Sequence, residues 1–294
     1  MIQELNALDV AFEQDLALSR KTSFHIGGPA ELVLFPASIE QMQRCIKLCN
    51  EHHQTPFILG NGSNLLVKDS GMDGVVICTE QLQTLELADE NMIYCQAGVV
   101  LSKLCSFAQK NSLAGLEFAF GIPGNLGGSI FMNAGAYDGE MKDVVHSVEY
   151  IDQTGELREL PASELDFGYR QSVFRKKGGV IVAAKLQLSP GDAEQIKTQL
   201  LDITARRREK QPLEFPSAGS VFKRPPGHFA GGLIQQCGLK GRSVGGAQVS
   251  EKHAGFIINT GNATAADVRA LIALVQAVVE QETGVLLEPE IQFV

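Results

Sequence analysis

The sequence predicts a mixed α+β fold divided into two domains, and three observations support this prediction. Segments whose apolar residues recur at helical spacing alternate with short apolar runs of strand length. One pair of these runs is joined by a polar turn of the kind found in antiparallel hairpins. A Pro- and Gly-rich stretch interrupts the pattern late in the chain, whose 294 residues suffice for two or three domains with cores of their own.

The first half of the chain mixes helix and strand patterns. Residues 39–49 have helical spacing, with Ser38 and Gln41 placed as in a capping box. Short apolar runs predict strands at residues 56–60, 74–80 and 92–98, and a second helix is expected over 101–111. Residues 115–137 carry glycines too densely for a helix interior and are too apolar for a free linker. We therefore expect this segment to be ordered backbone that wraps around a ligand.

The second half begins with a hairpin at residues 147–160, with Gln153–Gly155 at its turn, and a strand at 179–188. The pattern changes at residues 189–192, and a helix over 192–210 with a basic end precedes the Pro-rich stretch 211–219. We divide the chain into domains at 1–190 and 191–294. The second domain is expected to contain a strand at 253–261, a helix that starts at the Thr264–Asp267 capping box and ends at Gly284, and a terminal strand at 285–294.

Charge and cysteine content exclude several classes of protein. The chain has 25 basic and 34 acidic residues, a net charge of −9, which argues against nucleic acid or an anionic membrane as the main partner. It shows neither an apolar run of membrane-spanning length nor a secretory leader, so we expect a cytoplasmic protein without membrane insertion. The six cysteines form no CxxC pair, which predicts reduced, mostly buried thiols. Cys45 and Cys49 lie one helical turn apart without a nearby histidine pair, so no metal site is expected.

Two glycine-rich loops are the strongest signs of ligand binding. Residues 60–65, GNGSNL, lack the third glycine of a dinucleotide fingerprint, and no P-loop is present. Residues 60–64 by themselves fit either an anion-binding nest of backbone N–H groups or an ordinary hairpin turn. The second loop, residues 121–128, combines a proline corner with glycines that let backbone approach a flat ligand closely. Two such loops in one half favour a large cofactor with a phosphate end and a ring end.

Five motifs give the chain a family resemblance over nearly its whole length. They are GNGSNLLV (60–67), GIPGNLGGSIFMNAGAY (121–137), FGYRQSVF (167–174), AGSVFKRP (218–225) and LEPEIQF (287–293). Their order and spacing resemble those of UDP-N-acetylenolpyruvoylglucosamine reductases, FAD enzymes of peptidoglycan precursor synthesis. The segment SEKHAGFIIN (250–259) and the modest length resemble the shorter, type II branch.

The resemblance implies a fold, two cofactors and a reaction. It implies an FAD-binding region of the vanillyl-alcohol-oxidase type in two subdomains, about 1–80 and 81–190, followed by a substrate domain. Residues 285–294 of that domain would contribute to the active site. NADPH would reduce non-covalently bound FAD, and the flavin would reduce UDP-N-acetylglucosamine enolpyruvate to UDP-N-acetylmuramate. A monomer is expected, and neither His25 nor His253 is marked as a covalent flavin anchor.

Site residues follow from matching the family's motifs position by position. The catalytic set would be Arg170, whose guanidinium can hold the substrate carboxylate, Ser220, which would protonate the enol carbon, and Glu290. Ser217 and Glu288 are nearby residues of the same types as Ser220 and Glu290, but the motif match does not select them. The residues implied to bind FAD are Gly60, Asn61, Gly62, Ser63, Asn64, Leu65, Gly121, Ile122, Pro123, Gly124, Gly127, Gly128, Asn133, Gly135 and Ala136. Those implied to bind substrate are Tyr169, Lys210, Lys223 and Arg224, the last at a position where many members carry asparagine.

Two rival functions fit parts of the pattern. A flavin oxidase on the same scaffold explains the glycine loops but gives Arg170, Ser220 and Glu290 no shared task. A non-catalytic protein that binds sugar nucleotides would carry no flavin. A preparation that is colourless and cannot be reconstituted with FAD would favour the second rival.

Overall fold

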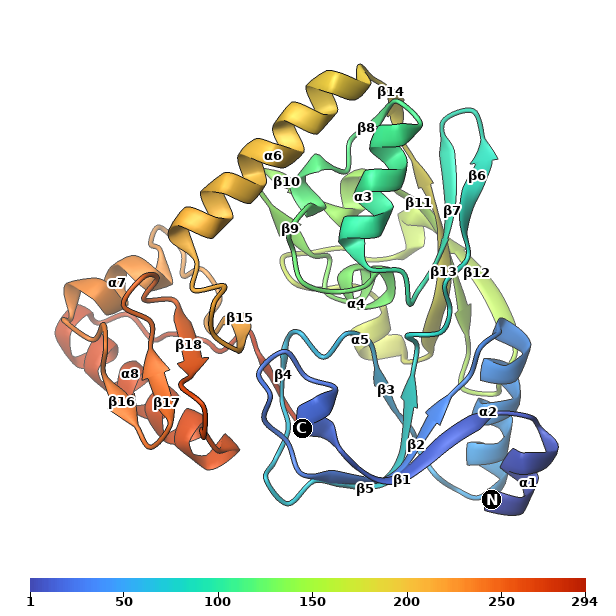
Figure 1. Ribbon diagram of the computed structural model, residues 1–294, viewed down its shortest axis with the longest axis horizontal. Coiled ribbons are helices and arrows are strands. Elements are labelled where there is room, and N and C mark those ends of the chain that lie inside the picture. Colours follow the sequence, from blue (N-terminus) through green and yellow to red (C-terminus); the bar gives the residue numbers. More distant parts are fainter. The chain divides into compact units, whose positions relative to one another are not determined.

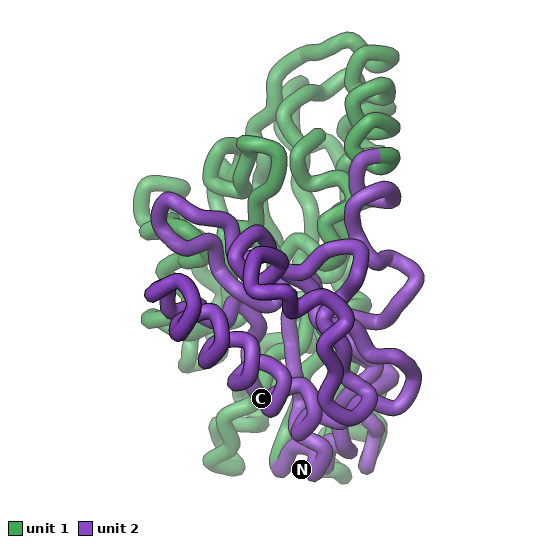
Figure 2. Tube along the Cα trace, turned by 90° about the vertical axis from the view of Figure 1, so that its left-hand side faces the viewer, with its two compact units in different colours: residues 1–14, 32–61, 74–205 green, residues 15–31, 62–73, 206–294 purple.

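The computed structural model describes all 294 residues, and its mixture of helices and strands confirms the α+β prediction. The chain forms two compact units, each assembled from three separate stretches (Figure 2). Unit 1 contains residues 1–14, 32–61 and 74–205, and unit 2 contains residues 15–31, 62–73 and 206–294. These units differ from the division at residue 190 that we expected from the sequence. Residues 15–31 and 62–73, from the N-terminal half, belong to the same unit as residues 206–294.

Unit 1 is built on a five-stranded antiparallel sheet with strand order β12-β11-β13-β7-β6. Its strands are β6 (Leu85–Asp89), β7 (Met92–Gln96), β11 (Val145–Ile151), β12 (Leu157–Pro161) and β13 (Val180–Gln187). The hairpin and the two strands predicted at 92–98 and 179–188 are thereby confirmed. Helix α3 (Leu101–Lys110), also predicted, lies beside this sheet in Figure 1 and buries one apolar face in the same core.

A second core of unit 1 surrounds helix α2 (Ile39–Glu51). The Ser38 hydroxyl accepts the Gln41 backbone N–H at 3.2 Å, which satisfies one of the free donors of the first turn and begins the helix where predicted. The helix buries Met42, Cys45 and Cys49. Its neighbours in sequence, β3 (Phe57–Leu59) and β5 (Met72–Cys78), pair in parallel within a four-stranded sheet of order β1-β2-β5-β3, where β1 is Ala11–Ala17 and β2 is Pro29–Phe35.

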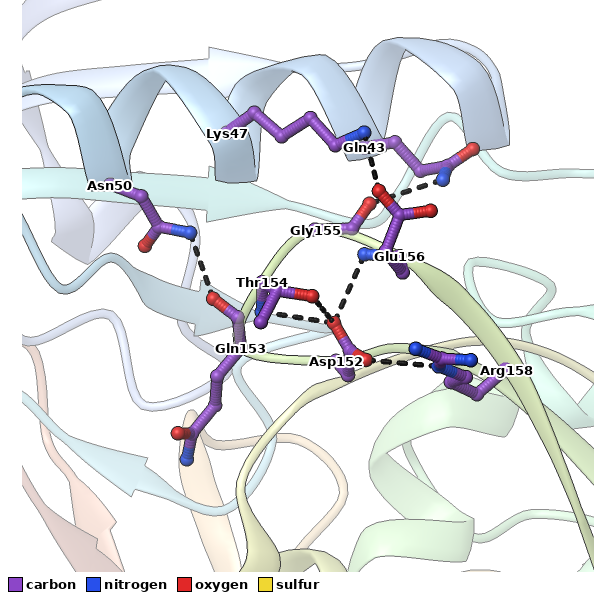
Figure 3. Close-up of polar contacts among 9 residues, drawn as sticks. All are labelled: Gln43, Lys47, Asn50, Asp152, Gln153, Thr154, Gly155, Glu156 and Arg158. Carbon is purple, nitrogen blue, oxygen red and sulfur yellow. Dashed lines mark hydrogen bonds and ion pairs between the residues drawn. The ribbon is translucent and has the colours of Figure 1, made fainter.

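The turn between β11 and β12 is tied to α2 by three polar contacts (Figure 3). They join Gln43 Nε2 to the Gly155 carbonyl (3.1 Å), Asn50 Nδ2 to the Gln153 carbonyl (2.8 Å) and Lys47 Nζ to Glu156 (2.8 Å). Hydrogen bonds from the Thr154 hydroxyl, backbone N–H groups and Arg158 hold the pKa of Asp152 below its ordinary value. The hairpin turn therefore has a fixed shape, and it connects the two cores of unit 1.

The expectation that residues 115–137 contain no helix is wrong at α4 (Leu126–Phe131). Asn125 caps this helix, because its side chain accepts the Gly128 N–H at 3.2 Å. A Cβ at Gly127 would lie 2.9 Å from the Cβ of Ala97, so glycine lets the helix pack closely against Ala97, the residue that follows β7. Tertiary packing thus outweighs the low helix propensity of glycine here.

Unit 2 combines a four-stranded sheet with two helices. The sheet order is β15-β18-β17-β16, with β15 Ser217–Ser220, β16 Ser243–Val244, β17 Ala247–Val249 and β18 Phe256–Asn259. Helix α7 spans Ala230–Gln236, and α8 spans Ala265–Thr283, between the predicted Thr264–Asp267 capping box and a left-handed Gly284. The core of unit 2 includes Phe24, Ile26 and Leu66 from the N-terminal half of the chain.

The prediction of one continuous strand over 285–294 is wrong. Only β19 (Gln292–Phe293) is a strand, parallel to β4 (Leu65–Leu66). Residues 288–290 instead run beside the segment that follows β15, where Phe222 and Pro289 form an isolated bridge. Pro289 occupies the non-hydrogen-bonded position of this bridge, between the bonds from the Lys223 N–H to the Glu288 carbonyl and from the Glu290 N–H to the Val221 carbonyl, so its missing N–H costs this pairing no bond.

The remaining elements are short, apart from one long helix. They are α1 (Ile2–Ala7), α5 (Phe174–Lys177), α6 (Ala193–Lys210), the pairs β8 (Leu113–Ala114) with β14 (Ser189–Pro190) and β9 (Gly135–Ala136) with β10 (Gly139–Glu140), and 3-10 turns at Leu18–Arg20, Glu117–Ala119, Met141–Asp143 and Ala162–Glu164. No helix is both long and apolar enough to cross a membrane. Five of the six cysteines are buried and all are free thiols, as predicted, and burial raises the pKa of Cys49 to about 11.

Candidate active site

The first glycine-rich loop follows β3 and requires glycine at two positions. A Cβ on Gly60 would lie 2.8 Å from Oδ1 of Asn125, so the first loop directly contacts the start of α4. Gly62 has a φ of +60°, and a Cβ there would lie 2.1 Å from the Lys21 carbonyl oxygen. The Gly62 carbonyl also accepts the Ser23 N–H at 3.2 Å. Side chains are thus excluded where the loop approaches other backbone.

Asn125 organises the second loop from a buried position. Its amide donates to the Thr79 hydroxyl at 3.3 Å, and its backbone carbonyl accepts the Ser129 hydroxyl at 2.7 Å. The side chain is 2% exposed, so these bonds are shielded from water. Around it, the exposed positions of the two loops are Asn61, Gly121, Pro123 and Gly128. Backbone at these positions is accessible to a ligand.

A third segment joins the second loop to the predicted arginine. Asn133 is fully buried, has a φ of +43°, and donates its amide to the Gly168 carbonyl at 3.0 Å and to Glu140 Oε2 at 2.5 Å. Arg170 Nη2 donates to the Gly135 carbonyl at 3.3 Å. The structure therefore brings together the predicted residues of unit 1, namely Gly60, the loop 121–128, residues 133–136 and Arg170.

Arg170 itself is held in an uncommon backbone conformation. Its φ is +55°, in the left-handed region that residues with a Cβ seldom adopt. Its carbonyl accepts Arg175 Nη1 at 3.1 Å, and its guanidinium carbon lies 4.9 Å from the centroid of the Tyr169 ring. Such strain is often found at functional sites, where it fixes the direction of one side chain. Tyr169 is 54% exposed.

In unit 2, Ser220 and Glu290 are joined through the backbone of Val221. The Val221 carbonyl accepts the Glu290 N–H at 2.7 Å, and Asn64 Nδ2 donates to the Glu290 carbonyl at 3.2 Å. The Ser220 hydroxyl donates to the Phe222 carbonyl at 3.2 Å. Both side chains are partly exposed. A hydroxyl and a carboxylate therefore lie on two adjoining, hydrogen-bonded segments.

The predicted substrate-binding residues of unit 2 have three different surroundings. Lys223 forms an ion pair with Glu288, and its N–H donates to the Glu288 carbonyl at 2.9 Å. The Arg224 guanidinium stacks on the exposed Phe229 ring, 4.0 Å from its centroid. Lys210 is exposed at the end of α6.

Comparison with known proteins identifies the family. Residues 211–294 match the C-terminal domain of UDP-N-acetylenolpyruvoylglucosamine reductase, and residues 30–161 match an FAD binding domain. The chain is 49% identical over 280 residues, 95% of its length, to the Clostridium perfringens (strain 13 / Type A) UDP-N-acetylenolpyruvoylglucosamine reductase, and covers 92% of that protein. The chain belongs to the UDP-N-acetylenolpyruvoylglucosamine reductase family. The enzyme of that name from Alkaliphilus oremlandii is 48% identical over 299 residues, covering all of this chain and 98% of that protein.

Solved structures place this reductase family member among flavoproteins of known fold. The Thermus caldophilus UDP-N-acetylenolpyruvylglucosamine reductase superposes with a TM-score of 0.83 at 35% identity, covering 97% of this chain and 98% of that one. An alkyldihydroxyacetonephosphate synthase superposes with a TM-score of 0.51 at 17% identity, covering 64% of this chain and 40% of that one, which concerns the fold alone. The predicted vanillyl-alcohol-oxidase type of FAD-binding region is thereby confirmed.

The loops of this family member fit FAD on the evidence of their own geometry. Gly60 and Asn125 are in contact, so the two glycine-rich loops adjoin, and their exposed positions offer backbone rather than long side chains. Ile122 is half-buried against the main core of unit 1 and supplies an apolar wall. Backbone polar groups beside apolar wall residues suit a cofactor with a phosphate end and a ring end.

Sequence reasoning missed Asn125 as a site residue. It lies inside a quoted motif, yet only its neighbours were assigned to the cofactor. The available signal was an asparagine in the helix-capping position before LGGSIF, which was overlooked because the segment was not expected to be helical. Its contact with Gly60 joins residues far apart in the sequence, which no local pattern reports.

Proposed function

We propose that this chain reduces UDP-N-acetylglucosamine enolpyruvate to UDP-N-acetylmuramate, with NADPH as hydride donor and non-covalently bound FAD as cofactor. The names of its relatives and the FAD binding domain support the reaction. The observation that carries the residue assignments is the bond through Val221, which joins a partly exposed hydroxyl at Ser220 to the segment of Glu290. This reaction is a step of peptidoglycan precursor synthesis.

What the flavin supplies when bound is hydride transfer, from NADPH to the β-carbon of the enolpyruvyl ether. The carbon beside the substrate carboxylate must then carry negative charge until it receives a proton. Arg170 stabilises that charge by holding the carboxylate in a forked pair of hydrogen bonds, which a planar guanidinium makes more rigidly than an ammonium group. Its strained backbone and its contact with Tyr169 preorganise the guanidinium.

Ser220 donates the proton. A serine hydroxyl is a weak acid, so the role requires a strongly basic acceptor, and the carbanionic carbon is one. The hydroxyl exchanges its bond to the Phe222 carbonyl for the reacting carbon, and the new C–H bond leaves an alkoxide on Oγ. Glu290 is the nearest carboxylate along the Val221 bridge, and we assign it to the same step.

The other assignments complete the proposal. Gly60–Leu65 and the FAD-binding positions within 121–136 hold the flavin, and Tyr169, Lys210, Lys223 and Arg224 contact the substrate. With a net charge of −9 and small-molecule partners, the enzyme works in the cytoplasm as a monomer. A single monomeric species in sedimentation equilibrium, with and without substrate, would support the last point.

Anaerobic half-reactions of the purified holoenzyme test the roles. In Ser220→Ala, NADPH should bleach the flavin at the wild-type rate, while reoxidation by the enolpyruvyl substrate should slow by about 10²–10⁴-fold, the usual contribution of a general acid. Ser217→Ala is the matched control, since Ser217 lies three residues away on β15 and bonds Ser23 through its backbone alone: its carbonyl accepts the Ser23 hydroxyl at 2.7 Å, and its N–H donates to the Ser23 carbonyl at 3.2 Å. Unchanged reoxidation in Ser220→Ala, or an equal loss in Ser217→Ala, would overturn the assignment.

A further inference from the structure

His253 is the centre of a closed turn in unit 2. Its ring Nδ1 accepts the Gly255 N–H at 3.1 Å, and its carbonyl accepts the Phe256 N–H at 2.9 Å. The Ser250 hydroxyl accepts the His253 N–H at 3.2 Å, and the Ser250 N–H donates to the Phe256 carbonyl at 2.9 Å. One histidine thus makes both bonds that direct the backbone into β18.

This turn contacts the end of β15, where Ser220 lies. The Gly255 carbonyl accepts the Val221 N–H at 2.9 Å, and Ser220 pairs with Phe256 in the β15–β18 ladder. A Cβ placed on Gly255 would lie 3.0 Å from Cε1 of His253 and 3.5 Å from Oγ of Ser220. The imidazole and the hydroxyl therefore border the same point, which only glycine leaves open.

The ring of His253 is suited to accept a bond while it is neutral. Burial lowers its pKa below the ordinary histidine value, and Lys240 acts in the same direction. A neutral ring that accepts at Nδ1 carries its proton on Nε2. Its face is also fixed by an edge-on contact with Phe256, at 4.9 Å between ring centroids.

We propose that His253 is a positioning residue for Ser220. By accepting the Gly255 N–H at its ring Nδ1, the histidine side chain fixes the turn that leads into β18, and β18 sets where the Ser220 hydroxyl stands relative to the reacting carbon. The bond from the Phe256 N–H uses the main-chain carbonyl, which any residue at position 253 supplies. The inference rests on the proposed function, because it matters only if Ser220 delivers the proton. It assigns His253 to the second half-reaction alone, since hydride transfer from NADPH does not use the Ser220 proton.

Substitutions at position 253 separate this role from a general structural one. Alanine removes the acceptor of the Gly255 N–H. Asparagine restores it, because an asparagine side-chain oxygen accepts the N–H two residues ahead in an Asx turn. His253→Ala should slow reoxidation of the reduced flavin by substrate by about 10²-fold, the effect of misplacing a reacting group by about 1 Å, with NADPH-driven reduction unchanged. His253→Asn should recover most of the lost rate.

Further variants keep the test decisive. Gly255→Ala should reproduce the loss without a substitution at position 253, since its methyl group would lie 3.0 Å from Cε1 of the ring, closer than an ordinary contact, and would displace the ring beside the Ser220 hydroxyl. His146→Ala is the control, because His146 is an exposed histidine of β11 in unit 1, and both half-reactions should keep their wild-type rates. FAD content and far-ultraviolet circular dichroism should match the wild type in every variant compared.

The outcomes are distinguishable from a failure of the proposed function. If Ser220→Ala reoxidises at the wild-type rate, the function assigned to Ser220 fails and this inference fails with it. If Ser220→Ala is slow while His253→Ala is not, only the inference is overturned. It is also overturned if His253→Asn is as slow as His253→Ala, or if both half-reactions slow equally.

Discussion

The contact between Gly60 and Asn125 allows a sharp prediction about the variant Gly60→Ala. The backbone of Gly60 is not in the left-handed region, so alanine brings no backbone strain of its own. Its methyl group would lie 2.8 Å from Oδ1, 3.1 Å from Nδ2 and 3.3 Å from Cγ of Asn125. Asn125 is 2% exposed and has little room to withdraw, so the clash must move the cap of α4 or the loop itself.

The magnitude follows from what Asn125 would lose. Loss of an N-cap costs about 0.5–2 kcal/mol, and forcing a methyl group into a packed site costs about 1–3 kcal/mol. Replacing glycine also restricts the unfolded chain, which offsets about 0.4–1 kcal/mol of this loss. We therefore expect the free energy of unfolding to fall by about 0.5–4.5 kcal/mol, with a central value of about 2.5 kcal/mol.

Urea unfolding of the apoprotein measures this change directly, and the flavin absorbance of the purified holoprotein measures FAD retention. The stability control is Gly128→Ala, whose methyl group would meet the same Asn125 oxygen at 3.3 Å and gains helix propensity, so its stability should change by less than about 1 kcal/mol. FAD retention should fall in Gly60→Ala if the displaced loop is part of the cofactor site.

A double-mutant cycle gives the result that would refute the reasoning. Asn125→Ser keeps a capping oxygen on a shorter side chain and leaves space for the new methyl group. The Gly60→Ala and Asn125→Ser changes should therefore be less than additive. Strict additivity, or a Gly60→Ala protein as stable as the wild type, would show that the close contact does not restrain the loop.

Two further predictions concern unit 2. Gly232→Ala should raise the free energy of unfolding by about 0.5–1 kcal/mol, because a Cβ within α7 would meet only Phe229 Cβ at an ordinary 3.7 Å; a lower urea midpoint would contradict this. The pKa of His253 is lowered from 6.5, so as the pH falls below 6.5 the unfolded chain takes up a proton first and stability decreases until the lowered folded-state pKa is passed. His253→Asn should remove that part of the decrease. If the free energies of unfolding of the two proteins changed with pH in parallel between pH 5 and 7.5, this prediction would be contradicted.

The elements that the sequence predicts correctly are those whose signals are local. Helix α8 has an apolar face, a capping box at Thr264 and a terminal glycine, and each of these signals lies within the helix or beside it. Helix α4 was missed because its glycine at position 127 is explained only by a tertiary contact. A Cβ there would lie 2.9 Å from the Cβ of Ala97, which is distant in the sequence. The terminal strand was overextended because Pro289 forms only an isolated bridge with Phe222, and only Gln292 and Phe293 pair with another strand, β4.

The same distinction applies to the site. Arg170, Ser220 and Glu290 were selected by motifs that resemble a known family, and the structure adds what surrounds each of them. The left-handed backbone of Arg170 and the Val221 bridge between Ser220 and Glu290 depend on contacts between distant segments. The side chains of Asn125 and His253 accept backbone N–H groups, of Gly128 and Gly255, and a sequence pattern does not report such bonds.

The assembly of unit 2 from three stretches has a consequence for biosynthesis. Residues 15–31 and 62–73 are synthesised well before residues 206–294, yet Phe24 and Leu66 belong to a core that this later stretch completes. The Leu66 carbonyl accepts the Val294 N–H at 3.0 Å, and the Lys68 N–H donates to the Val294 carbonyl at 2.9 Å. Contacts so remote along the chain form slowly, and only after residue 294 has left the ribosome. If translation stalled before residue 290, these apolar segments would stay exposed to solvent. We therefore expect a chaperone to bind them or a protease to cleave them in such a stalled chain.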